Sequence, residues 1–350
     1  MTAAVTAEQS AGRDAGQDAG PETGQGAGLD AGPDTAEGTP APLARLRWRS
    51  AMTGAFVATL VRPASWALGL AGFLAGGGLV IVSWPILVLP TPTGLQNALG
   101  TPVSSLVFGS PSAGLVALIM VGAAVSVAVL AGALVAGAWA ERQGIEMTLA
   151  AADDEGLIAA LPDLRGAPGT SRVALVRLFS LVPVAVVMAL AWQPLYDVTY
   201  HELILPEDLV TPLPIRVIRS VPWLLAGIAA TWLVSDTAAA EGVRRLVLER
   251  RSVPAAWALG WVDLVHRPLR VLGAALAGIV VLVLLAGPSL ILAAVGWQRV
   301  RDLVGLGQPP ALVLVAVMVW VSIWLGGLVL TAVGAAFRTA AMTMEAVRRS

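Results

Sequence analysis

The stretch 236–270, DTAAAEGVRRLVLERRSVPAAWALGWVDLVHRPLR, decides the fold of this chain. It lies between two long apolar runs and holds the densest cluster of charge in the sequence. Ser252 is a suitable residue to cap a helix, and Trp257 and Trp261 then fall on one face of that helix. We therefore predict a cytoplasmic helical elbow over residues 241–268, joining two membrane spans.

The composition indicates a membrane protein. Charged residues make up 13 % of the chain, AVILMFWYC residues make up 57 %, and the mean hydropathy is +0.78. A water-soluble domain usually carries about 25 % charged residues. Apolar runs of about 20 residues recur, which is the length that crosses a hydrocarbon core about 30 Å thick. The fold class that we predict is all-α, a polytopic integral membrane helical bundle.

We predict a six-span membrane domain over residues 66–345. The expected spans cover about residues 66–89, 115–139, 173–192, 217–240, 269–295 and 311–337. Glu141 and Arg142 are expected to end the second span, and the helix of the fourth span is expected to continue out of the membrane to Arg251. Gly72 and Gly76 form a GxxxG motif in the first span, which is typical of close helix packing.

Two segments precede the first span. Residues 1–42 are rich in Gly, Ala and Pro and carry a net charge of −6, so they cannot bury enough apolar surface to fold. We expect a disordered acidic tail, either simply solvated or used for docking. Residues 43–65 combine Arg residues and Trp48 with apolar residues at every fourth position. This pattern predicts a cytoplasmic interfacial helix, ended by Arg62 and Pro63.

Residues 90–113 carry no charge, and their Pro and Gly residues exclude one continuous helix. They form either an external loop or a re-entrant loop.

The distribution of Arg predicts the topology. All basic residues are Arg, and the abundance of Ala, Gly and Val indicates the coding bias of a GC-rich bacterium. The positive-inside rule favours a bacterial cytoplasmic (inner) membrane with both termini cytoplasmic. Only four Arg residues then fall in the outer loops, namely Arg216, Arg219, Arg299 and Arg301. Because the other Arg residues flank apolar runs, we expect them to meet anionic lipid head groups and not nucleic acid.

Arg177 and Asp236 are the candidate functional residues inside the spans. An ionisable residue within a span is costly and marks a function or a partner. Both residues should lie about one turn inside the cytoplasmic boundary, so an intramembrane ion pair is one prediction. Contact of Asp236 with lipid head groups and a transport or proton-transfer role are the alternatives.

The elbow itself carries charged residues at helical spacing. Glu241 with Arg244 and Arg245, and Asp263 with Arg267, are spaced three or four residues apart, which is typical of a solvated helix surface. The functional alternative is a basic patch that contacts lipid phosphates, formed by Arg244, Arg245, Arg250 and Arg251.

No reactive motif is present. The absence of cysteine excludes disulfides, thiol nucleophiles and iron–sulfur clusters. The two histidines, His201 and His266, form no metal-binding spacing, and no nucleotide-binding or GxSxG motif occurs. We expect no cofactor, no metal and no catalytic residue. An outer loop with Tyr200, His201, Glu202, Glu207 and Asp208 is either an acidic site or an ordinary solvated loop.

A short pattern repeats in the chain. Leu60-Val61-Arg62-Pro63 resembles Leu264-Val265-His266-Arg267-Pro268, and each copy follows a Trp-bearing helix and precedes a Gly-rich span. Together with AAAEG at 238–242 and AWAL at 256–259, these motifs resemble the six-span membrane domain attached to some glycerophosphodiester phosphodiesterases, and related uncharacterised bacterial integral membrane proteins. The resemblance would cover residues 43–345. It implies a fold and no reaction, because the catalytic barrel of those enzymes has no counterpart here.

Three functions remain open. The first is a non-enzymatic accessory or scaffold protein with a membrane protein partner, since the spans hold few polar residues. The second is a secondary transporter or export permease for a small or lipid-like solute, favoured by the prolines within the spans. The third is a lipid-modifying enzyme, which would require a cluster of His, Asp or Glu at one face of the membrane.

Overall fold

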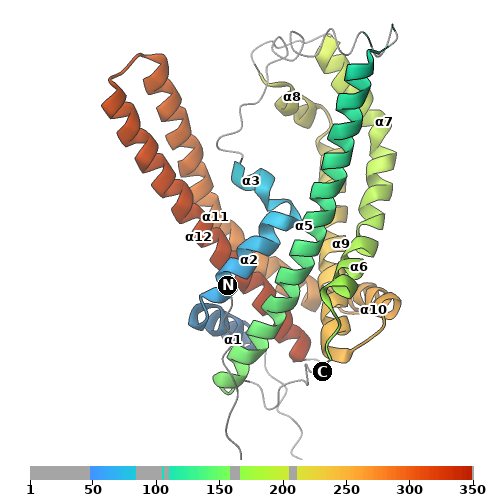
Figure 1. Ribbon diagram of the computed structural model, residues 1–350. Coiled ribbons are helices and arrows are strands. Elements are labelled where there is room, and N and C mark those ends of the chain that lie inside the picture. Colours follow the sequence, from blue (N-terminus) through green and yellow to red (C-terminus); the bar gives the residue numbers. More distant parts are fainter. Residues whose placement is uncertain are drawn as a thin grey trace, which may run out of the picture. The chain divides into compact units, whose positions relative to one another are not determined.

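A computed structural model describes residues 48–83, 111–157, 166–204 and 211–348, together with the isolated positions 105 and 109 (Figure 1). Within these residues every regular element is a helix. The helices are α1 (Trp48–Val61), α2 (Ala64–Phe73), η1 (Leu74–Gly78), α3 (Leu79–Ser83), α5 (Ala113–Asp154), α6 (Thr170–Ser180), α7 (Val182–Ile204), α8 (Leu213–Ser220), α9 (Pro222–Glu249), α10 (Val253–His266), α11 (Pro268–Gly305) and α12 (Pro310–Val347).

Six helical segments are long and apolar enough to cross a membrane, as the sequence predicts. They are Ala64–Ser83, Ala113–Asp154, Thr170–Ile204, Pro222–Glu249, Pro268–Gly305 and Pro310–Val347.

Proline and glycine decide where several of these segments begin or break. Pro222, Pro268 and Pro310 each occupy the first position of a helix. A backbone N–H at that position would have no acceptor within the helix, so the helix loses no hydrogen bond by having proline there. In the first segment, a π-helical turn separates α2 from α3. Gly77 adopts a φ of 98° in that turn, a left-handed conformation that glycine adopts most readily. The first apolar segment is therefore a broken helix.

Several boundaries differ from the prediction. Helix α5 runs straight through Glu141 and Arg142 to Asp154, because both side chains find ion-pair partners and nothing in the backbone stops the helix. Helix α9 begins at Pro222 and not at 217, since Val221 has non-helical dihedral angles and separates it from α8. Ser252 does occupy the N-cap position of α10, but its side chain makes no capping hydrogen bond.

Some predictions fall outside the described residues. They are the disordered tail over 1–42, the start of the interfacial helix up to residue 47, and the part of the first span beyond Ser83. Most of the loop over 90–113 is also outside, so the choice between an external and a re-entrant loop stays open.

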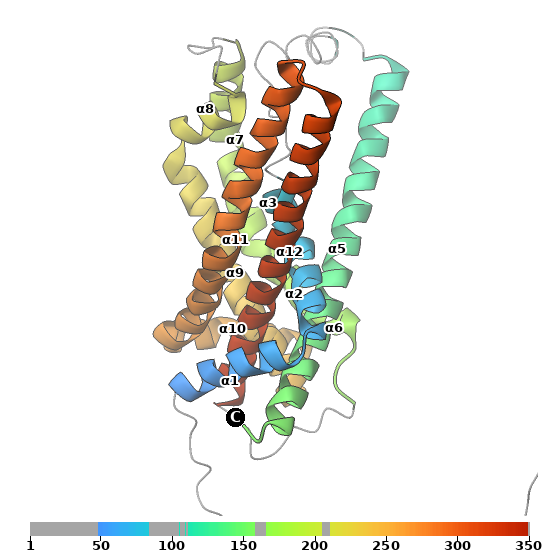
Figure 2. The ribbon, with the colours of Figure 1, turned by 90° about the vertical axis from the view of Figure 1, so that its left-hand side faces the viewer.

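One end of the helix bundle is closely packed. Helices α1, α6 and α10 pack there against residues 141–154 of α5, 236–249 of α9 and 338–347 of α12 (Figure 1). We call this region the base. Its largest apolar cluster includes Ile145, Leu149 and Val173, all fully buried. Helix α1 lies across α12, where Ala51 and Ala55 pack against the α12 side chains (Figure 2).

Glycines allow helix backbones to approach closely in the bundle. A Cβ at Gly69 in α2 would lie 2.5 Å from the backbone nitrogen of Ala336 in α12. A Cβ at Gly260 in α10 would lie 2.9 Å from the backbone nitrogen of Gly242 in α9. The GxxxG pair makes no such close approach: a Cβ at Gly72 would lie 3.8 Å from the Cβ of Ala140, an ordinary contact, and a Cβ at Gly76 would meet no described atom within 4 Å. Close packing therefore involves Gly69, Gly260 and other glycines such as Gly278 and Gly334 of the α11–α12 pair, and not the motif that the sequence singles out.

Away from the base the helices are sparsely packed. None of the most apolar window of α5 is buried, and only 6 % of the corresponding window of α12 is buried. Helices α11 and α12 form a long antiparallel pair (Figure 2), and α12 also packs against α1, α2 and α5. Leu118 and Leu130 of α5 expose 68 % and 69 % of their surface. The described residues thus divide into a packed base and exposed apolar helical arms.

Candidate functional site

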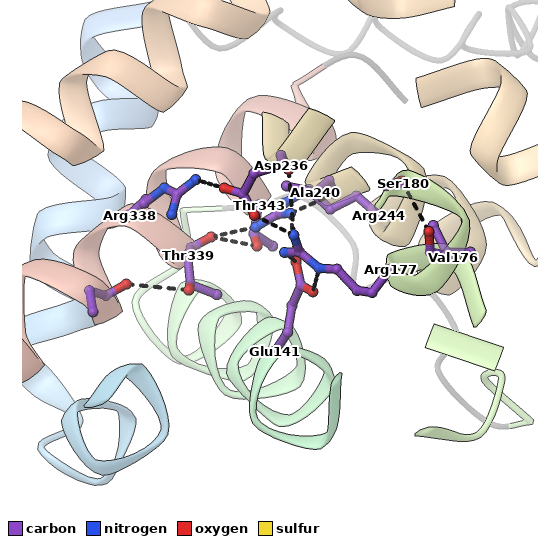
Figure 3. Close-up of polar contacts among 11 residues, drawn as sticks. Glu141, Val176, Arg177, Ser180, Asp236, Ala240, Arg244, Arg338, Thr339 and Thr343 are labelled. Carbon is purple, nitrogen blue, oxygen red and sulfur yellow. Dashed lines mark hydrogen bonds and ion pairs between the residues drawn. The ribbon is translucent and has the colours of Figure 1, made fainter. Parts of the chain in front are cut away.

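The structure brings Arg177 of α6 and Asp236 of α9 together. The Nη1 atom of Arg177 lies 2.6 Å from Oδ1 of Asp236 (Figure 3). Their side chains are 24 % and 19 % exposed, so the ion pair is largely shielded from the surroundings. Both residues belong to helices that are long and apolar enough to cross a membrane. The depth of the pair in a membrane, and a transport or proton-transfer role for Asp236, stay predictions.

Arg177 also holds a second carboxylate. Its Nε and Nη2 atoms donate to the two carboxylate oxygens of Glu141, at 2.8 Å and 2.7 Å. This is the two-pronged geometry in which a planar guanidinium binds a carboxylate most strongly. Because Glu141 is on α5, Arg177 links three helices (Figure 3).

Two further arginines complete the cluster, which we call the ionic network. Arg338 of α12 donates to Oδ2 of Asp236. Arg244 of α9 is only 2 % exposed; its Nη1 lies 3.3 Å from Oε1 of Glu141 and donates at 2.6 Å to the carbonyl oxygen of Ala240. The Nη2 atom of Arg244 donates at 3.2 Å to the carbonyl oxygen of Thr339 on α12.

The ionic network is balanced in charge. Glu241 is 1 % exposed and interacts electrostatically with Arg244, so three arginines face three acids. Taking ionised groups out of water is costly, and the cost is offset only when each charge is paired and hydrogen-bonded. Each arginine of the network has an acidic partner, although the Nε atoms of Arg244 and Arg338 are buried without a hydrogen-bond partner among the described residues. These ion pairs tie α5, α6, α9 and α12 together at the base. The carboxylates of Glu141 and Asp236 each pair with two arginines.

The structure corrects the expected solvated surface at the elbow. Glu241 and Arg244 point into the bundle, because α9 continues inward against α6, α10 and α12. Arg245 pairs with Glu249, one turn later on α9, and its Nε lies 2.9 Å from Oδ2 of Asp263 on α10. Asp263, which is 9 % exposed, therefore faces Arg245 and not Arg267.

The four predicted lipid-phosphate contacts do not share one surface. Arg244 is buried in the ionic network and cannot reach a head group, which corrects the prediction for that residue. Arg245 is 25 % exposed and engaged by Glu249 and Asp263. Arg250 and Arg251 follow the end of α9 and are exposed. Arg250 adopts a left-handed φ of 55°, and Nε of Arg251 lies 3.3 Å from a carboxylate oxygen of Glu249.

The predicted outer acidic site is only partly within the described residues. Glu202 pairs with Arg216 at 3.5 Å and accepts a hydrogen bond of 3.1 Å from Ser220. Glu207 and Asp208 lie outside the described residues. What the structure shows here is a local ion pair that fastens α8 to the end of α7.

Among the described residues, no group of three or more His, Asp or Glu side chains is placed to hold a metal ion. The expectation that the protein uses no cofactor stays a prediction. A small hollow between α3, α11 and α12 is lined by Val82, Ser289, Trp324 and Thr331 among others. Across it, Nε1 of Trp324 donates at 3.2 Å to the carbonyl oxygen of Val82, joining the broken first segment to α12.

Sequence reasoning misses Glu141, Glu241, Arg244 and Arg338 as members of the ionic network. One signal was available: Glu141 lies two residues beyond the second predicted span, and Glu241 and Arg338 directly follow the fourth and the sixth. Residues near the cytoplasmic ends of their spans lie at a similar depth in the membrane, and this argument predicts the pair of Arg177 and Asp236. Applied to all span ends, that argument would have added Glu141, Glu241 and Arg338. The burial of Arg244 has no such signal.

Searches of protein-family models, of curated proteins and of solved structures find no match to this chain.

Proposed function

We propose that this protein is a multi-pass component of a bacterial cytoplasmic membrane, with both termini cytoplasmic, that acts without catalysis as a scaffold for a partner membrane protein. The observation that carries the proposal is the contrast between the packed base and the exposed arms. In the base, apolar side chains and paired charges are buried. In the arms, the most apolar window of α5 has no buried residue.

The base supports the scaffold role because it is built for rigidity. Arg177, Glu141, Asp236 and Arg338 join helices that are far apart in the sequence, and each charge has a partner. A group that transports a proton or an ion must be able to release its partner during the cycle. The paired groups of the ionic network instead favour one fixed arrangement of the helices.

The exposed arms supply the surface on which a partner would assemble. In a membrane, helices associate through close van der Waals packing and small residues, and not through the hydrophobic effect. Helix α5 carries Ala124, Ala128 and Gly132 at four-residue spacing, and a Cβ at Gly132 would meet nothing within 4 Å. Such a face fits a second transmembrane helix.

The proposal is tested by photo-crosslinking in native membranes. A photoreactive amino acid is placed at Leu130 of α5, which is 69 % exposed, and as a matched control at Leu149 of the same helix, which is fully buried in the base. We expect a crosslinked partner from position 130 and only internal crosslinks from position 149. Recovery of lipid adducts alone from position 130, and from neighbouring exposed sites on α5, would contradict the scaffold role.

A secondary transporter is the second candidate, and one observation favours it. The first apolar segment is broken at Gly77, and broken helices form the substrate sites of many transporters. Uptake of a labelled solute into proteoliposomes that contain only this protein, abolished by Gly77→Ala, which disfavours the left-handed conformation at the break, would favour transport over the scaffold role.

A further inference from the structure

Two corners of the fold share one construction. Helix α1 ends at Val61, and Arg62-Pro63 turns the chain into α2, which opens the first apolar segment. Helix α10 ends at His266, and Arg267-Pro268 turns the chain into α11, which is the fifth apolar segment. The repeat seen in the sequence therefore has a structural counterpart, since each corner puts an arginine where an apolar segment begins.

The first corner is closed by the chain itself. Arg62 pairs with Asp154 at the end of α5. The indole Nε1 of Trp66 donates at 2.8 Å to the carbonyl oxygen of Thr59, which fastens α2 back onto α1. This arginine already has its anion.

The second corner is open. In the part of the chain that the structure describes, neither Arg267 nor Arg270 has an ion pair or a side-chain hydrogen bond, and both are exposed. The acid nearest to them in the sequence, Asp263, is buried and engaged by Arg245. The corner is thus a site of uncompensated positive charge.

Exposed apolar side chains accompany this charge. Leu269 exposes 90 % of its surface and Val265 exposes 72 %. We call Val265, Arg267, Leu269 and Arg270 the corner patch. Such exposure of Leu269 and Val265 to water is unfavourable, and two unpaired arginines lie beside them. This combination fits a binding surface that has both an apolar and an anionic layer. The boundary of a phospholipid leaflet offers both layers.

We propose that the corner patch binds the head group of an anionic phospholipid. The guanidinium groups of Arg267 and Arg270 donate hydrogen bonds to phosphate oxygens, as arginine does readily, while Val265 and Leu269 enter the adjoining acyl region. The chemistry favours a lipid over an acidic protein because the patch sits where the apolar segment Pro268–Gly305 begins. The predicted lipid contact thereby moves from the end of α9 to the start of α11.

The test is native mass spectrometry of the protein in a neutral detergent, titrated with phosphatidylglycerol or with phosphatidylcholine. Each arginine near an anionic lipid surface contributes about a fivefold change in affinity, so Arg267→Gln with Arg270→Gln should weaken binding of the first phosphatidylglycerol about 25-fold. Arg62→Gln is the matched control, because that arginine is paired within the chain, and it should leave the affinity unchanged.

A second variant probes the apolar half of the patch. Val265→Ser with Leu269→Ser should weaken phosphatidylglycerol binding while keeping its dependence on salt, since the charges remain. Both side chains are exposed, so these variants should fold. Equal binding of both lipids by the unmodified protein, or unchanged phosphatidylglycerol binding by the double arginine variant, would overturn the proposal.

This inference rests on the proposal that α11 crosses a membrane. The two can fail separately. If the unmodified protein is recovered from cells in the soluble fraction, the membrane role itself fails. If it stays in the membrane fraction and the double arginine variant binds phosphatidylglycerol as before, only the corner patch is wrong.

Discussion

Replacing Asp236 by Asn should destabilise the base. Asn keeps the shape of the side chain and removes its charge, so Arg177 loses one of its two carboxylates and Arg338 loses its acceptor at Oδ2. The bidentate contact between Arg177 and Glu141 remains. The main effect is an arginine at position 338 whose charge is no longer balanced.

The expected magnitude follows from burial. Removing one partner of a buried ion pair costs about 3–5 kcal/mol of unfolding free energy. Asp236 and Arg338 are 19 % and 24 % exposed, which favours the lower end of that range, about 3 kcal/mol. For a large chain each 1 kcal/mol lowers the melting temperature by about 2 °C, so a drop of about 6 °C is expected.

The assay is thermal unfolding in a mild detergent, followed by intrinsic tryptophan fluorescence. Arg62→Gln is the matched control, because it removes one partner of an ion pair whose side chains are 35 % and 61 % exposed. An exposed pair contributes about 0–1 kcal/mol, which is a shift of at most about 2 °C. A shift for Asp236→Asn no larger than that of the control would refute the buried network.

A double-mutant cycle separates the pair from the rest of the network. Arg177→Gln alone removes one arginine from both Glu141 and Asp236, which keep only Arg244 and Arg338, so we expect it to be more destabilising than Asp236→Asn. Because the two residues are in contact, the double variant should be less destabilised than the sum of the single variants. Strict additivity would show that the contact between Arg177 and Asp236 contributes nothing.

Three other substitutions test the helix contacts. Gly260→Ala should lower the melting temperature, because its Cβ would meet the backbone of α9. Gly227→Ala, in open space on α9, should leave the melting temperature unchanged or raise it. Equal shifts for the two variants would contradict the close approach of α10 to α9. Gly77→Ala should destabilise the fold by about 1–2 kcal/mol, because Gly77 has a left-handed φ of 98° that alanine adopts only with strain, although a Cβ there would meet no described atom within 4 Å. An unchanged melting temperature would show that the segment can straighten at no cost. Trp324→Phe should remove the hydrogen bond to the carbonyl oxygen of Val82 and speed hydrogen exchange of α3 amides, and unchanged exchange would show that α3 does not depend on α12.

Salt should affect the corner patch and the ionic network differently. Exposed charges such as Arg267 and Arg270 are screened at high ionic strength, so lipid binding there should weaken. The contacts of Arg244, which is 2 % exposed, are screened much less. Melting in detergent should therefore change little between low and high salt, while the affinity for phosphatidylglycerol should fall. A melting temperature that drops steeply with salt would contradict the buried position of the network.

The sequence by itself determined the all-helical class and the six long apolar segments, because these depend on local composition and on the length of each run. The predicted starts of the fifth and sixth spans lie within one residue of Pro268 and Pro310, which open α11 and α12 through their own backbone, whereas α9 begins at Pro222 and not at the predicted 217. The sequence also identified Arg177 and Asp236 as candidate residues, because a charged residue inside an apolar run can be recognised without knowledge of the packing.

Only the tertiary structure decided which charges are buried. Glu241 and Arg244 have the spacing of a solvated helix surface, and nothing local distinguishes them from Glu249 and Arg251. Their burial follows from α6, α10 and α12 packing on that side of α9. The same holds for the two arginine corners, which read alike in sequence. Arg62 is neutralised because α5 extends as far as Asp154, whereas no acid among the described residues pairs with Arg267. Contacts between residues so far apart in sequence exist only once the helices have packed.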